Sequence, residues 1–180
     1  MQALILNEAM SENELRGMAI RPVYRSDSGC IADLYRRLSP ESRELRFMAP
    51  QGRMSEAGTW RQAQRVAEGD AATQAALVVV ACEPDGEAVI AVAEWVRETQ
   101  EPTSAEIGLV VRDDYQRQGI GSALLRQLVQ VARDEGIMTI TGYLLPQNEG
   151  MRRLLRRLGT PFTLETRRGL TTLSAPIGRA

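Results

Sequence analysis

The sequence contains neither histidine nor lysine, and all 22 of its basic residues are arginines. Without histidine it cannot form a histidine general base, a histidine–zinc site or a Ser-His-Asp triad. Without lysine it cannot form a Schiff base or the Gly-Lys-Ser/Thr end of a P-loop. If the protein is an enzyme, carboxylates are therefore the leading candidates for its general base.

Cysteine is also scarce, because only Cys30 and Cys82 are present and they lie far apart in the sequence. They have neither the spacing of a metal site nor the number that a disulfide scaffold requires. We expect no metal site and two reduced, partly buried thiols. Cys82 ends an apolar run, so it is expected to be a small core residue.

Long hydrophobic runs and a large net charge are absent as well. The longest apolar run, about residues 75–82, is too short to span a bilayer. The N-terminus lacks the basic and apolar regions of a secretory signal, so we expect a cytoplasmic protein. A net charge of −1 gives no electrostatic basis for binding nucleic acid or an anionic membrane. A homodimer is compatible with the sequence.

What the sequence does contain is enough apolar residues for one domain with a core, since 43% of its 180 residues are hydrophobic. We expect an N-terminal extension over residues 1–17 and a single domain over residues 18–178. Apolar periodicity and turn residues predict an α/β fold. The expected strands cover residues 18–24, 75–82, 87–96, 104–112, 138–145, 162–167 and 170–175. The expected helices cover residues 28–38, a short stretch from residue 39, 55–67, 119–135 and 148–159.

A glycine-rich turn, Gln116-Arg117-Gln118-Gly119-Ile120-Gly121, separates an expected strand from an expected helix. Such a turn forms an anion site from main-chain N–H groups and the helix dipole. Glycine lets a phosphate approach the main chain without a Cβ in the way. A dinucleotide motif would need a third glycine where this chain has Leu124. The strand–helix–strand crossover over residues 104–145 requires parallel pairing, with a ligand expected at the start of its helix.

The motif Q-x-x-G-x-G, after the fourth strand of this order, resembles the acyl-CoA loop of the GNAT superfamily of N-acyltransferases. The resemblance implies a mixed six- to seven-stranded sheet with splayed parallel strands 4 and 5 and helices on both faces. It also implies that pantetheine lies along the fourth strand and that the turn holds the pyrophosphate of acetyl-CoA, the expected co-substrate. The cofactor-binding residues so implied are Leu109, Val110, Val111, Gln116, Arg117, Gln118, Gly119, Ile120, Gly121, Ser122 and Asn148.

A second resemblance is narrower. The segment Leu38-Ser39-Pro40-Glu41-Ser42, followed by Leu45-Arg46-Phe47, is similar to the second-helix region of bacterial protein lysine acetyltransferases (the Pat-like group). That group usually carries a further regulatory or synthetase-like domain, whereas these 180 residues are expected to form the acyltransferase domain alone. The resemblance implies direct acetyl transfer to a primary amine, with protein lysine favoured over a small molecule. It also implies that Glu106 is the general base. Glu94, which interrupts an apolar strand, is the second candidate.

Several alternatives stay open in the sequence. Glu106 can also be a solvated strand residue, and Glu94 can point outward. Tyr143 can donate a proton, although a core tyrosine is the expected role. The tyrosine that many GNAT enzymes use as general acid is replaced here by Leu155. A non-catalytic acyl-CoA-binding or sensing module is the alternative function.

A basic cluster follows Asn148 on the last expected helix. Its functional interpretation is contact with the 3′-phosphate of CoA or with an acidic partner, and a solvated polar face is favoured over both. The cluster consists of Arg152, Arg153, Arg156 and Arg157.

Overall fold

The computed structural model describes residues 17–178, so the expected N-terminal extension lies outside the described residues except for Gly17. Within this range, seven strands and five α-helices follow one another in the predicted order. The strands are β1 (Met18–Pro22), β2 (Gln74–Glu83), β3 (Gly86–Arg97), β4 (Ser104–Val111), β5 (Thr139–Leu144), β6 (Thr163–Arg167) and β7 (Leu170–Pro176). The helices are α1 (Ser28–Arg37), α2 (Pro40–Phe47), α3 (Glu56–Glu68), α4 (Ile120–Asp134) and α5 (Glu149–Leu158). Short 3-10 helices are η1 (Arg25–Asp27), η2 (Pro50–Gly52) and η3 (Asp113–Tyr115).

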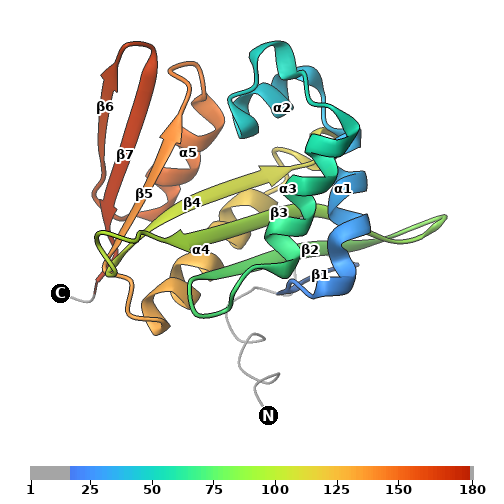
Figure 1. The fold of residues 1–180 in the computed structure, drawn as a ribbon, viewed down its shortest axis with the longest axis horizontal. Coiled ribbons are helices and arrows are strands. Elements are labelled where there is room, and N and C mark those ends of the chain that lie inside the picture. The colour runs from blue at the N-terminus through green and yellow to red at the C-terminus, as the bar shows by residue number, and fades with distance from the viewer. Residues whose placement is uncertain (1–16, 179–180) are drawn as a thin grey trace.

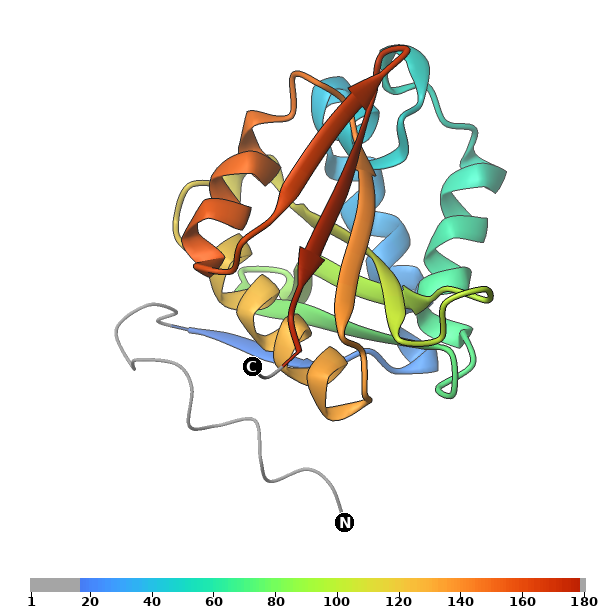
Figure 2. The same cartoon turned by 90° about the vertical axis from the view of Figure 1, so that its left-hand side faces the viewer.

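The strands form one mixed sheet in the order β1-β2-β3-β4-β5-β7-β6, in which only β4 and β5 are parallel neighbours among the described strands. Helices α1 and α3 cover one face, and α4 and α5 cover the other (Figures 1 and 2). The first pair buries Ile31 and Val66 against Val92 and Val110. The predicted mixed sheet with helices on both faces is confirmed.

Helix α4 shows why the sequence predicted its position. Leu124, Leu125, Leu128 and Ala132 recur at helical spacing, and each is at most 1% exposed. This stripe packs against the sheet in the larger of the two cores. The predicted buried face of this helix is therefore confirmed.

Strands β4 and β5 separate soon after they begin. Only Ser104–Glu106 of β4 pair with Thr139–Thr141 of β5, although β4 continues to Val111 and β5 to Leu144. Figure 1 shows the two strands diverging beyond this short pairing. The predicted splay of the parallel strands is confirmed, and beyond Glu106 it leaves one side of β4 without a neighbour among the described strands.

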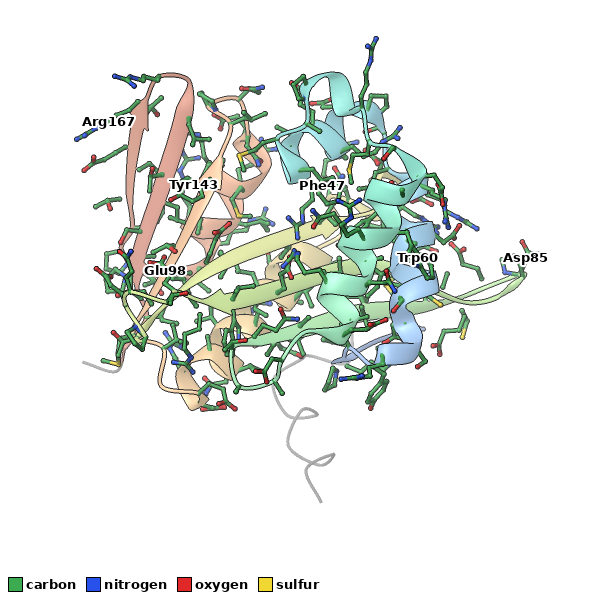
Figure 3. All side chains as sticks on the ribbon, viewed as in Figure 1. Phe47, Trp60, Asp85, Glu98, Tyr143 and Arg167 are labelled. Carbon is green, nitrogen blue, oxygen red and sulfur yellow. The ribbon has the colours of Figure 1, made fainter. Side chains whose placement is uncertain are left out.

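Two predicted core residues are exposed. Cys82 and Cys30 are both free and exposed, so the predicted burial of Cys82 is wrong: it follows the buried run of β2 near the end of that strand. Tyr143 is 52% exposed, so its predicted core position is wrong too. Its neighbours Gly142 and Leu144 are buried on the opposite face of β5. The face that carries Tyr143 lies beyond the region covered by α1 and α3 (Figure 3).

Candidate active site

A cavity of about 630 Å³ lies at the splay of β4 from β5, a volume typical of small-ligand sites. Its walls come from the end of β4, the turn into α4, the start of α4, and helices α5 and α2. They consist of Glu41, Ser42, Leu45, Arg46, Leu109, Val110, Val111, Asp113, Gln116, Arg117, Gly119, Gly121, Ser122, Asn148, Gly150, Met151, Arg153, Leu154 and Arg157.

Most of the residues that the sequence assigned to cofactor binding lie together in this cavity, and two do not line it. The Gln118 side chain turns back and donates to the main-chain oxygen of Asp114 at 3.0 Å. The Ile120 side chain is 1% exposed and belongs to the core. Only the main chain of these two residues could contribute to a site in the turn.

The free edge of β4 presents main-chain groups to the splay. Arg112 N–H donates to the oxygen of Ile90 on β3 at 2.8 Å. Because the bonds of an antiparallel pair alternate, Leu109 and Val111 direct their N–H and C=O groups away from β3. The Val111 oxygen accepts a bond from Gln116 Nε2 at 3.0 Å. The remaining groups of this edge can pair with an extended ligand.

The turn and the start of α4 form the second polar wall. Arg117 and Gly119 adopt positive φ values of 63° and 87°, which turn the chain sharply from η3 into the helix. Gly119 caps α4 without any side-chain hydrogen bond. Ser122 lines the cavity, and its Oγ is buried without a hydrogen-bond partner among residues 17–178. Unpaired donors at a helix N-terminus are suited to an anion.

Arginines surround this wall. Arg117 lies in the turn, and Arg153 and Arg157 lie one helical turn apart on α5, and all three line the cavity. Arg152, from the same basic cluster, instead donates to the Pro146 oxygen at 3.3 Å. Arg153 and Arg157 are exposed, as the favoured prediction of a solvated polar face requires, and they also line the cavity.

The two candidate carboxylates have very different surroundings. Glu106 is exposed and lies opposite Thr141, in the last pair before β4 and β5 separate. It does not line the cavity. Glu94 is 4% exposed, and its Oε1 accepts bonds from Arg46 Nη2 at 2.5 Å and Arg65 Nη2 at 2.6 Å. Only Glu106 is accessible to a substrate from solvent.

The Arg46 guanidinium is fixed from several sides. It lies over Gly108, where a Cβ would be 2.8 Å from its Nη2. Burial lowers the pKa of Arg46, but the Tyr35 phenol and the Glu94 carboxylate outweigh burial, and the pKa is raised overall. Burial also raises the pKa of Tyr35 to about 12. This arrangement keeps a cation at the junction of the cavity and β4.

Residues 31–160 match the model of the acetyltransferase (GNAT) family. The chain belongs to this family. A stretch of 77 residues, 43% of this chain, is 40% identical to acetyltransferase Pat of Mycolicibacterium smegmatis and spans 23% of that protein. The GNAT domain of S. lividans PAT has a TM-score of 0.73 and 26% identity, covering 87% of this chain and 89% of that domain.

A further GNAT structure, an acetyltransferase of Salmonella typhimurium solved with acetyl-CoA, has a TM-score of 0.66. It covers 92% of this chain and 96% of its own, and at 19% identity it shows the fold alone. The predicted GNAT family, the resemblance to the Pat-like group and the fold class are thus confirmed. The acceptor is a separate question.

Helix α5 of this GNAT domain offers no phenol. Leu155, expected where many family members have a tyrosine, is 1% exposed and packs in the core. Leu154 lines the cavity instead, and the helix contains no tyrosine. Any proton donor to a leaving group must therefore come from elsewhere.

Two further findings apply to residues 17–178. No group of three or more carboxylate or thiol side chains there is arranged to hold a metal ion. Among the same residues, no helix is long and apolar enough to cross a membrane.

Proposed function

We propose that this GNAT domain transfers an acetyl group from acetyl-CoA to a primary amine, by direct attack in a ternary complex. A single observation carries the proposal. The free edge of β4 and the start of α4, which no side chain caps, meet in one cavity, with Glu106 at the point where the strands separate. The residues present fit an acyl-CoA, because the buried Ser122 hydroxyl has no partner among the described residues and because Arg117, Arg153 and Arg157 line the same cavity.

The cofactor needs contacts beyond the helix end. A helix N-terminus contributes about 0.3–1 kcal/mol per exposed charge, and up to about 2 kcal/mol when partly buried. Micromolar affinity requires about 8 kcal/mol. The edge of β4 around Leu109 is proposed to pair with the amide-containing pantetheine arm. Arg117, Arg153 and Arg157 are proposed to bind the phosphates, with Asn148 fixing the start of α5 through its bond to Met151 N–H at 3.0 Å.

Glu106 is proposed as the general base. An alkylammonium with a pKa near ~10.4 is only about 0.04% neutral at pH 7, and reaching the free amine costs roughly 4.6 kcal/mol. An exposed carboxylate at the splay can take that proton directly or through water. Glu94 is proposed as the counter-charge of Arg46 and Arg65 rather than as a second base.

The proposed transfer needs no covalent enzyme intermediate. The amine nitrogen forms a bond to the acyl carbon, the carbon–sulfur bond breaks, and the electron pair leaves on the CoA sulfur. The amine proton passes to Glu106. If the CoA thiol has a pKa near ~8.5, as a cysteine does, its thiolate leaves with little help. The lack of a phenol on α5 is therefore compatible with turnover.

A protein lysine is favoured as the acceptor over a small-molecule amine. The support is the likeness to the Pat proteins and the position of the α2 segment that carries it. Glu41, Ser42, Leu45 and Arg46 of α2 line the cavity. Tyr143 of β5 is exposed (Figure 3). Glu106 is exposed as well and pairs with Thr141, two residues before Tyr143, so a lysine on a protein surface could approach Glu106 from this side.

Glu106→Gln tests this function. We expect unchanged acetyl-CoA binding and a loss of turnover of about 10²- to 10⁴-fold, largest near neutral pH and smaller where the amine is already neutral. Glu165→Gln is the matched control. Glu165 lies on the same face, two strands beyond β5, and is ion-paired with Arg167 at 3.3 Å. Both variants should keep the wild-type melting temperature.

The acceptor is tested by incubating labelled acetyl-CoA with a cell lysate, the protein, and Glu106→Gln as the blank. Label in protein above the blank supports the lysine acceptor. These 180 residues contain no lysine, so labelling of its own side-chain amines cannot confuse the result. Label confined to metabolites would replace protein lysine by a small amine. Tight acetyl-CoA binding with no transfer to any amine would favour the sensing module.

A further inference from the structure

Helix α2 forms one wall of the cavity, yet none of its residues is buried. Near its end Phe47 packs edge-to-face against Tyr35, with ring centroids 4.9 Å apart. Arg46 pairs with Glu94 on the sheet below. A helix without a buried apolar face gains little from hydrophobic burial, so polar contacts must fix its position.

At the start of α2, the carboxylate of Asp113 gathers three donors from residues more than seventy positions earlier. Its Oδ2 accepts from Ser39 N–H at 2.9 Å, and its Oδ1 accepts from Ser39 Oγ–H at 2.8 Å and Ser42 Oγ–H at 2.7 Å. Ser39 Oγ also caps the helix by accepting from Ser42 N–H at 3.1 Å. Asp113 itself is the first residue of η3 and follows β4 after a single residue, Arg112.

Gln116, the first residue of the Q-x-x-G-x-G motif, joins the same contacts. Its Nε2 donates to Ser42 Oγ at 3.2 Å and to the Val111 oxygen at 3.0 Å. We call Ser39, Ser42, Asp113 and Gln116 the α2 latch. Three of its members, Ser42, Asp113 and Gln116, line the cavity. The latch therefore joins the α2 wall to the turn that precedes the start of α4.

The charge of Asp113 is stabilised where it is. Burial alone would raise the pKa of Asp113, but the bonds from Ser39 and Ser42 outweigh it and the pKa is lowered. The carboxylate therefore remains an acceptor for all three donors at neutral pH.

We propose that Asp113 is a positioning residue for acyl-CoA binding: it holds α2 against the β4–α4 turn, so that both walls of the cavity keep one geometry. This inference rests on the proposed function, because it concerns the same cavity. Asp113 acts through α2 and the turn rather than by touching the reacting atoms. Without the latch, only the fraction of molecules with α2 in place is competent to bind.

Asp113→Asn tests the proposal with two readouts, hydrogen exchange of the α2 amides and the Kd for CoA by calorimetry. We expect faster exchange over residues 40–47 with unchanged exchange in α4. If one tenth of the molecules keep α2 in place, the apparent Kd rises about tenfold. Asp114→Asn is the matched control. Asp114 is the next residue, and its carboxylate bonds Arg112 rather than α2.

Ser42 supplies a second test without a change of charge. Ser42→Ala removes the bonds to Asp113 and Gln116. It should speed the hydrogen exchange of α2 and raise the Kd for CoA, each by less than Asp113→Asn does. Ser42→Thr keeps the hydroxyl, and it should restore slow α2 exchange and CoA affinity. If Asp113→Asn fails to fold, Ser42→Ala and Ser42→Thr are compared with wild type in its place.

Wild-type CoA affinity in a folded Asp113→Asn, or in Ser42→Ala when Asp113→Asn does not fold, would overturn the proposal. So would α2 exchange that does not differ from wild type. The proposed function fails separately. In that case the wild-type protein would bind no CoA, while the exchange of α2 in the variants would still report whether the latch holds the helix.

Discussion

Glu94→Gln separates a structural carboxylate from a catalytic one. The change preserves the shape of the side chain and removes its charge. Glu94 is 4% exposed, and the side chains of its partners are 14% exposed for Arg46 and 44% for Arg65. The variant therefore leaves one well-buried guanidinium without its carboxylate.

The magnitude follows from this burial. Removing one partner of a buried ion pair costs about 3–5 kcal/mol, because the other charge stays buried and uncompensated. The pair with the half-exposed Arg65 contributes only about 0–1 kcal/mol. For a domain of this size, each kcal/mol lowers the melting temperature by roughly 2–4 °C. Glu94→Gln should therefore lower the melting temperature by about 6–20 °C.

Calorimetric melting of three variants measures the effect. Arg65→Gln, the matched control, removes the more exposed partner and should lower the melting temperature by no more than about 4 °C. The double variant Arg46→Met/Glu94→Leu replaces the buried pair by apolar side chains. It should melt above Glu94→Gln, because no uncompensated charge remains.

The outcome that refutes this reasoning is specific. If Glu94→Gln melts within about 2 °C of wild type while turnover falls at least tenfold, Glu94 acts in the chemistry. Its bonds to Arg46 and Arg65 would then contribute little to stability. The assignment of the base to Glu106 alone would have to be abandoned.

Two further predictions concern the cofactor turn and acid stability. Gly121→Val should raise the Kd for CoA at least about tenfold, or roughly 1.4 kcal/mol. A Cβ added at Gly121 would already be in contact with the Leu154 methyls at 3.4 Å, so the two methyl groups of valine would take up space in the cavity that Gly121 lines. Gly29→Val is the control: Gly29 is likewise the second residue of its helix, α1, and a Cβ there would meet nothing within 4 Å, so the Kd should not change. If calorimetry gives the two variants the same Kd for CoA, the cofactor site is not at this turn. Burial raises the pKa of Asp27, but the contacts with Arg21 and the bond from Tyr24 N–H together outweigh burial and lower the pKa overall. The free energy of unfolding of wild type should thus exceed that of Asp27→Asn by a constant amount above about pH 3.9, and the difference should shrink as the pH falls through the lowered pKa of Asp27 in the folded protein. Urea unfolding of both proteins from about pH 6 to about pH 2 measures this difference.

Much of the fold could be predicted because its signals are local. The stripe of Leu124, Leu128 and Ala132 specifies a helix packed on one face. Strand patterns on both sides of this helix require the parallel crossover, and a crossover of this kind places a ligand at the helix start. The position of the cavity follows from this chain of reasoning, with the Q-x-x-G-x-G motif as an independent signal.

Other features depend on residues that are distant in sequence. The exposure of Tyr143 depends on where α1 and α3 end over the sheet, and strand periodicity carries no information about that. The role of Asp113 depends on hydroxyls 71 and 74 residues away. An aspartate after a strand is common in turns, so its own sequence context gave no signal of the latch.

Glu94 and Glu106 show most clearly what the structure adds. In the sequence both are acidic residues within apolar strands, and strand periodicity alone does not distinguish them; only the family resemblance ranked Glu106 first. The structure separates them by their partners, because Arg46 comes from α2 and Arg65 from α3, 48 and 29 residues before Glu94. A base has to meet the amine and exchange protons with solvent. Glu94 is buried and ion-paired with two guanidinium groups, whereas Glu106 is exposed where the splayed strands separate. We therefore propose that the acid–base chemistry belongs to Glu106, the more exposed of the two carboxylates.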